Sequence, residues 1–245
     1  MRELSELIHG DDPAWPVLQK EFATTSVPLK VLPGDPEQGR SCLLQLQVSV
    51  ESYLGALALH SGGLILDGGW LRVFGGSTMT GADALPGLAQ VNRFPAAFDP
   101  EWRPANGLIV GQDVLGGVFA LNGHDAAEAG RPGTPGQVIY FAPESLEWQA
   151  LEMGYGTWLT WLLTGRLEQF YGGLRWPGWR AEIRALPPAH GIAFYPFLWS
   201  DEAHADLAAT SRRPVPAREL LRMSADSCRQ LGLDSPGFLG PNPSG

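Results

Sequence analysis

Turn-forming residues interrupt this chain at short intervals, which limits how long its helices and strands can be. The 245 residues include 31 glycines and 21 prolines. Turns such as PGDP at 33–36, DGG at 67–69 and RWPGW at 175–179 separate short apolar segments. This spacing favours a mixed or β-rich fold over a helical bundle.

One glycine-rich stretch, GQDVLGGVFALNG at 111–123, has two possible interpretations. It has the glycine spacing of a phosphate-binding loop, but Gly117 stands where that loop needs lysine and Val118 where it needs a hydroxyl. The dinucleotide pattern G-x-G-x-x-G is also absent from the sequence. We therefore interpret the stretch as a turn between two paired strands, with Asp113 at the rim of a sheet.

Hydrophobic periodicity predicts the main elements. Asp12 is predicted to cap a helix that has Pro13 at its first position. Ser52 is predicted to cap a second helix, which ends at Gly62–Gly63, and Thr157 is predicted to cap a third. Further helices are predicted around 36–47 and within 215–232. Strands are predicted at 29–32, 64–67, 70–74, 108–110, 118–121, 138–141, 147–151 and 192–199, and Pro196 interrupts the last of them.

These elements predict an α+β fold with a curved, mainly antiparallel sheet flanked by helices. We expect a single domain over residues 1–231 and a flexible tail over 232–245, because no linker divides the chain and the last residues, DSPGFLGPNPSG, are rich in glycine and proline.

Charge and cysteine content narrow the class of protein. Seventeen basic against 26 acidic residues give a net charge of −9, which opposes binding to nucleic acid but suits a basic protein partner. Cys42 and Cys228 are far apart and indicate two reduced thiols. No apolar segment at the N-terminus suits a signal peptide, and no apolar run is long enough for a membrane span, so we expect a cytoplasmic protein.

Motifs for chemistry are absent. The sequence lacks G-x-S-x-G and H-E-x-x-H, the patterns of a serine nucleophile and a zinc site. SDEAHAD at 200–206 gathers possible metal ligands, but a solvated acidic helix start explains it better. We predict no catalytic residue, no cofactor and no metal.

Two groups of residues are candidates for binding. Asp113, Glu144 and Trp148 could line a pocket that carries carboxylates. The second group lies in RWPGWR at 175–180, where tryptophans and arginines are combined as at interaction hot spots. Its members are Arg175, Trp176, Trp179 and Arg180. The alternative for the second group is that both tryptophans cover the core.

A series of motifs resembles a known bacterial family. DDPAWP, LGALALHSGGLILDGGWLRVFG, GLIVGQDVLGGVFALNG, VIYFAPESLEW, YGGLRWPGW, FYPFLW and SRRPVPAREL are together similar to the domain of unknown function DUF2625, over nearly the whole chain. That family implies no activity. Residues 40–170 also resemble the SUKH superfamily. This resemblance implies an α+β fold with a curved, mainly antiparallel sheet. It also implies a binding role, since many bacterial members are immunity proteins that neutralise toxin domains.

The leading hypothesis for function is non-enzymatic binding of another protein, with an immunity-type inhibitor as one form of it. The alternative is a small-molecule-binding protein or hydrolase with a carboxylate-lined pocket near Asp113, Glu144 or Trp148. A concave pocket with converging polar groups would favour the alternative, and a broad exposed apolar or acidic face would favour protein binding.

Overall fold

The computed structural model describes residues 1–77, 85–104 and 107–240. Its strands are β1 (Leu29–Pro33), β2 (Ser61–Leu66), β3 (Leu71–Phe74), β4 (Leu108–Asp113), β5 (Val118–Leu121), β6 (Gln137–Ala142), β7 (Glu147–Gly154), β8 (His190–Tyr195) and β9 (Ser211–Pro216). Its α-helices are α1 (Leu4–Ile8), α2 (Trp15–Thr24), α3 (Pro36–Leu46), α4 (Tyr53–His60), α5 (Leu88–Val91), α6 (Tyr155–Leu162), α7 (Leu167–Phe170), α8 (Trp179–Arg184), α9 (Asp201–Ala205) and α10 (Ala217–Leu231).

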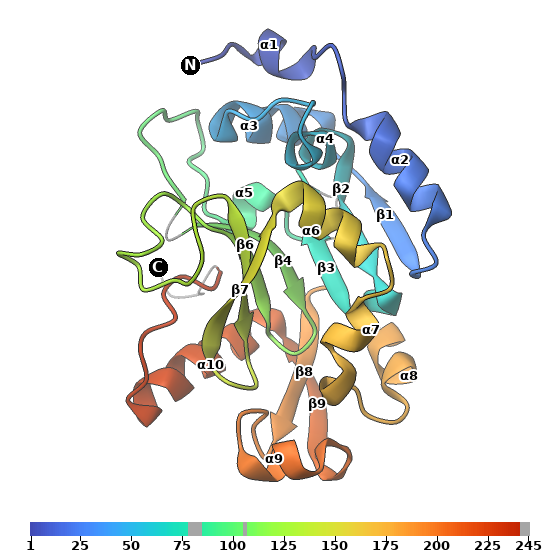
Figure 1. Ribbon diagram of the computed structural model, residues 1–245, viewed down its shortest axis with the longest axis vertical. Coiled ribbons are helices and arrows are strands. Elements are labelled where there is room, and N and C mark those ends of the chain that lie inside the picture. The colour runs from blue at the N-terminus through green and yellow to red at the C-terminus, as the bar shows by residue number, and fades with distance from the viewer. Residues whose placement is uncertain (78–84, 105–106, 241–245) are drawn as a thin grey trace.

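The first seven strands form one sheet in the order in which they occur along the chain (Figure 1). Each strand is antiparallel to its neighbours. β8 and β9 form a separate antiparallel pair. This architecture confirms the predicted α+β class with a mainly antiparallel sheet. It also confirms the turn between paired strands predicted in GQDVLGGVFALNG, since residues 114–117 connect the end of β4 to β5.

The strand register assigns side chains to two faces of the sheet, because successive residues in a strand point to opposite sides. One row across the sheet consists of Lys30, Ile65, Arg72, Gln112, Val118, Phe141 and Trp148. We call this side the Arg72 face. The adjacent row, on what we call the Val73 face, consists of Val31, Leu64, Val73, Gly111, Phe119, Tyr140 and Gln149.

The Val73 face is covered by α6 and the segment that follows it. Trp158 of α6 is fully buried, with its ring centroid 5.3 Å from that of Phe119. Gly111 leaves room for this indole, since a Cβ on Gly111 would lie 3.2 Å from the Trp158 ring. Phe170 of α7 packs against the same row through Tyr140. The core therefore lies largely between this face and the helices.

The Arg72 face meets the C-terminal elements, which lie below the main sheet in Figure 1. Ile192 of β8 donates its backbone N–H to the carbonyl of Val114 at 2.7 Å, which joins the small sheet to the turn after β4. α10 has a strongly amphipathic sequence and buries Leu220, Leu221 and Cys228. These contacts enclose space between the sheet and α10.

Several predicted boundaries were wrong. The helix predicted after Asp12 begins at Trp15, with Ala14 as its N-cap and a proline in its first turn. The helix from Tyr53 ends at His60, because the chain enters β2 at Ser61 and both glycines at 62–63 lie in that strand. The structural cause is strand pairing, since β2 pairs with β1 from Ser61 and with β3 from Gly63.

Two further boundaries differ near the C-terminal half. Gly154, not Thr157, is the N-cap of α6, which therefore begins at Tyr155. The strand predicted over 192–199 ends at Tyr195, because Pro196 has no N–H to donate to the ladder.

The predicted tail begins directly after α10. Residues 233–235 are exposed, whereas Pro236 and Leu239 are buried, and 241–245 lie outside the described residues. Within the described part of the chain, no helix has the length and apolar character that crossing a bilayer requires.

Candidate functional site

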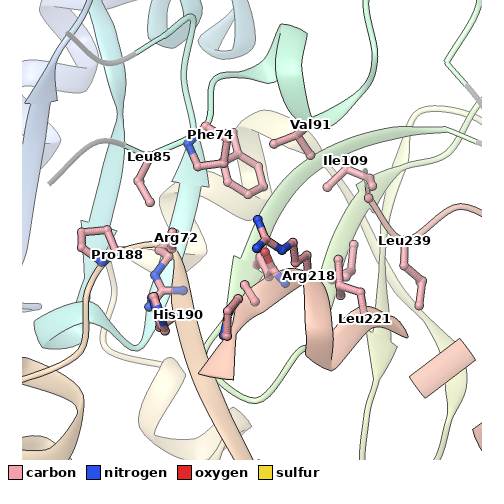
Figure 2. Close-up of a pocket in the computed structure, with 17 residues that line it drawn as sticks. Arg72, Phe74, Leu85, Val91, Ile109, Pro188, His190, Arg218, Leu221 and Leu239 are labelled. Carbon is pink, nitrogen blue, oxygen red and sulfur yellow. The ribbon is translucent and has the colours of Figure 1, made fainter. Parts of the chain in front are cut away.

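A pocket of about 250 Å³ lies between the Arg72 face and the C-terminal elements (Figure 2). β3, β4 and β5 form its floor with Arg72, Gln112 and Val118. Pro188–His190 and the first turn of α10 form another side, and Leu239 closes part of the opening. The site thus combines the centre of the main sheet with segments that begin 70 residues after Val118.

Arg72 is the most unusual residue of this pocket. It lies in the apolar strand WLRVF, and only 3% of its surface is exposed. Its Nε and Nη1 atoms are buried and have no hydrogen-bond partner among the described residues. Pairing with Ile65 on one side and Gln112 on the other holds the backbone at the centre of the sheet. The alternation of the strand then directs the side chain to the pocket side.

The charge of Arg72 persists at neutral pH despite its burial. Burial lowers the pKa of the guanidinium to about 10, and the negative charge of Asp113 opposes this shift. A pKa near 10 leaves the side chain protonated at physiological pH. The pocket therefore has a fixed positive charge in its wall, with donor groups that no described protein atom uses.

Two more polar atoms on the pocket wall lack partners. Gln112 Nε2 and His190 Nδ1 are both buried without a hydrogen bond. Arg218 is exposed and lines the mouth, at the N-terminal end of α10. That helix end has no side-chain cap, and its backbone dipole adds positive potential on the same side.

The rest of the wall is apolar. Figure 2 shows Arg72 and His190 on one side of the pocket and Val91, Ile109 and Leu239 on the opposite side. No carboxylate occurs among the described lining residues. Chemically, the pocket offers unpaired donors at one end and hydrocarbon contacts at the other, an arrangement that suits an anion with an apolar body.

The predicted site residue Asp113 lies on the other side of the sheet and is fully buried. Its Oδ2 accepts hydrogen bonds from the hydroxyls of Tyr140 at 2.7 Å and Tyr171 at 2.9 Å. Its Oδ1 accepts the backbone N–H groups of Leu115 and Gly117, both at 2.8 Å. Burial raises the pKa of this carboxyl, and the four hydrogen bonds oppose that shift.

Glu144 and Trp148 do not line the pocket. Glu144 is half-buried, and its Oε2 atom has no partner among the described residues. Burial is the main cause that raises the pKa of its carboxyl, and the negative charge of Asp113 raises it further. Trp148 donates from Nε1 to the carbonyl of Pro236 at 3.0 Å, and the guanidinium of Arg131 lies 4.1 Å from the centre of its ring. It therefore anchors the chain after α10.

The RWPGWR residues form part of an aromatic core around Trp70. Trp176 and Trp179 are 2% and 6% exposed, and their ring centroids lie 5.9 and 4.9 Å from that of Trp70. Arg175 forms a buried ion pair with Asp67 and lies over the rings of Trp70 and Trp179.

Arg180 is exposed and covers the outer side of Trp179. The structure thus places both tryptophans of RWPGWR in the core, and a binding role for the seven predicted residues remains a prediction. Sequence reasoning missed Arg72, Gln112 and His190. The available signal was a cation inside an otherwise apolar strand, WLRVF.

Acidic SDEAHAD forms α9, capped by Ser200, as the helix interpretation predicted. Over residues 1–77, 85–104 and 107–240, no group of three or more histidine, cysteine or acidic side chains could hold a metal ion.

Comparisons with known proteins identify relatives without assigning an activity. The family model described as "Protein of unknown function DUF2625" matches residues 4–220. A "Putative uncharacterized protein YbfG" of Escherichia coli is 37% identical over 91% of this chain and 95% of its own length. An "Uncharacterized protein" of Haemophilus influenzae is 30% identical over 82% of this chain and 84% of its own. No solved structure matches the chain significantly, so the likeness to the SUKH superfamily stays a prediction.

Proposed function

The chain belongs to the DUF2625 family of proteins of unknown function, and we propose that it binds a small organic anion in the pocket on the Arg72 face. The observation that carries this proposal is Arg72 in the pocket wall, a residue that is 3% exposed and whose Nε and Nη1 atoms have no partner among the described residues. An ion removed from water without a partner destabilises a fold by several kcal/mol. A bound anion would offset that cost.

The surroundings of Arg72 support the same proposal. Gln112 and His190 bring further unused polar atoms to the pocket, and Arg218 stands at its mouth. The net charge of the chain is −9, so the overall composition does not explain a cationic pocket. The apolar remainder of the wall provides contact area for the body of a ligand.

Calorimetric titration with a panel of amphipathic anions tests the proposal. The panel contains octanoate, octyl sulfate, octyl phosphate and naphthalene-2-sulfonate. We expect saturable binding of at least one anion, and Arg72→Met to weaken it by about 30-fold or more, because the buried charge is removed. Arg229→Met is the matched control, since Arg229 is an exposed arginine on α10 that pairs with Asp226 and does not line the pocket. The absence of binding, or equal affinities for the wild type and Arg72→Met, would contradict the proposal.

Protein binding is a second candidate, supported by an exposed aromatic surface. Tyr195 is 72% and Phe197 38% exposed, and the ring of Phe197 stacks on Trp199 at 5.3 Å. The acidic helix α9 follows directly, with Asp201 and Glu202 both exposed. Aromatic area beside negative charge suits a basic partner protein, and immunity-type neutralisation of a toxin is one form of such binding.

Affinity capture from a bacterial lysate tests this second function. Wild-type protein is compared with Tyr195→Ser/Phe197→Ser, in which both substitutions lie outside the pocket on the Arg72 face. We expect the wild type alone to retain a protein with net positive charge, and high salt to release it. Retention of the same proteins by both forms would contradict a role for this surface.

A further inference from the structure

We infer that the ligand of the Arg72 pocket is a monocarboxylate with an unbranched or single-ring hydrocarbon body, a proposal that rests on the anion-binding function above. The inference comes from three features of the pocket: its buried charge, the arrangement of its donors and its apolar volume.

The buried charge indicates a singly charged ligand. Arg72 is the one arginine or lysine among the described lining residues that is buried, because Arg218 is exposed at the mouth. Asp113 directly follows Gln112, the cross-strand partner of Arg72, and its carboxylate interacts with the Arg72 charge from the other face of the sheet. This negative charge reduces the positive potential available to a ligand. A phosphate monoester, with up to two charges, would keep one of them without a buried partner.

The arrangement of donors suits a flat anionic group. Arg72 and Gln112 are direct neighbours across β3 and β4, and both carry unpartnered nitrogen atoms on the pocket side of the sheet. A guanidinium presents its N–H groups in one plane, which matches the two oxygens of a carboxylate. The amide nitrogen of Gln112 adds a third donor, and a carboxylate has enough lone pairs to accept all of them.

The apolar side of the pocket sets the body of the ligand. Phe74, Val91, Ile109, Leu221 and Leu239 are all buried and present hydrocarbon surface. A cavity of about 150 Å³ holds benzene in another protein, so the pocket of about 250 Å³ accommodates roughly ten non-hydrogen atoms. Octanoate has this size. Its carboxylate would lie at Arg72 and its chain would extend toward Leu239, on the opposite side in Figure 2.

A ligand series measured by calorimetry tests the charge and the head group separately. Octanoate is compared with octanamide, which is neutral, and with octyl phosphate, which has the same chain and a larger head group. We expect octanamide to bind about 30-fold more weakly or worse, because it lacks the charge that pairs with Arg72. We expect octyl phosphate also to bind more weakly than octanoate.

Chain length tests the volume. From butyrate through hexanoate to octanoate, affinity should rise about fourfold per methylene group, and it should stop rising beyond octanoate because the pocket is filled. Leu239→Trp should shorten this range, so that hexanoate binds as well as octanoate. A continued rise through dodecanoate would contradict the proposed size.

Two arginine variants complete the experiment. Arg72→Met should abolish the difference between octanoate and octanamide. Arg72→Lys keeps the charge without the planar fork and should weaken octanoate about tenfold. Circular dichroism establishes that both variants are folded.

The outcomes separate the two proposals. If octyl phosphate or octyl sulfate binds best and requires Arg72, anion binding stands and the monocarboxylate inference is wrong. If no anion binds in an Arg72-dependent manner, or octanamide binds as tightly as octanoate, both proposals are wrong.

Discussion

Arg72 and Gln112 face each other across the β3–β4 ladder, and each has buried nitrogen atoms without a hydrogen-bond partner. They occupy the middle of a row that continues into the apolar residues Val118 and Phe141. Apolar side chains at positions 72 and 112 would also pack well in this row. Buried polar groups in folded proteins are normally paired. Two unpaired neighbours on one pocket wall are therefore better explained by binding than by stability.

Arg72→Met should leave the unfolding free energy of the unligated protein unchanged or raise it by up to about 4 kcal/mol, because it replaces a buried charge that has no direct partner among the described residues with an apolar side chain. Arg175→Met is the contrasting variant. It leaves Asp67 in a buried site without its ion pair and should lower stability by about 3 kcal/mol or more. Urea unfolding measures both. Equal losses would mean that Arg72 is structural.

Gly117→Ala should destabilise the fold by about 3 kcal/mol or more. A Cβ at this position would lie 2.2 Å from Asp113 Oδ2 and 2.3 Å from Tyr140 Oη, both in buried side chains. Gly123→Ala, in the loop that follows β5, is the control, since the nearest neighbour of its Cβ would be at 3.8 Å. We expect that variant to be neutral or stabilising by up to about 1 kcal/mol. Thermal unfolding of the two variants gives the comparison, and similar melting temperatures would refute the steric argument.

Asp113→Ala should lower the unfolding free energy by about 3 kcal/mol or more, because four buried donors lose their acceptor. Tyr140→Phe removes one of those donors and leaves the carboxylate with three, so a loss of about 1 kcal/mol is expected. Chemical denaturation measures each variant. A smaller effect of Asp113→Ala than of Tyr140→Phe would show that the carboxylate does not organise this cluster.

The two thiols should react slowly with a thiol reagent at pH 8 in the native protein and rapidly after unfolding. Both cysteines are almost fully buried, and burial raises the pKa of Cys42 from 9.0 to about 11. The thiolate is the reactive form, and the native fold suppresses it.

The same shift makes stability depend on pH. Between pH 9.0 and about 11 the folded state keeps the Cys42 proton that the unfolded state loses, so the contribution of Cys42 to stability declines as pH rises through this window. Denaturant midpoints of the wild type and Cys42→Ala, measured across this range, check the sign. A larger decline in Cys42→Ala would contradict it.

Truncation after Leu233 should lower stability by about 2 kcal/mol, chiefly through the lost burial of Leu239. The removed segment is held by Trp148, which donates to the carbonyl of Pro236, and by Arg131, which donates to that of Phe238 at 3.2 Å. Truncation after Gly240 is the control and should leave the melting temperature unchanged. If both truncations behave alike, the segment 234–240 does not contribute to the fold.

The sequence alone determined some local features of this protein, although it misplaced the N-caps of α2 and α6. Glycines and strand-forming runs predicted the β4–β5 turn. The capping residue Ser52 correctly predicted the start of α4, and its side chain accepts the N–H of Gly55. Such features depend on contacts between residues close in sequence, so local propensity is enough to recognise them.

The tertiary structure decided which polar residues are buried and which of them face a cavity. Asp113 looked accessible at the end of a strand, but Tyr171, 58 positions later, helps to enclose it. Arg72 looked like an ordinary strand residue until β4 and α10 covered it. Burial arises from register and packing between distant segments, and no local pattern encodes those contacts.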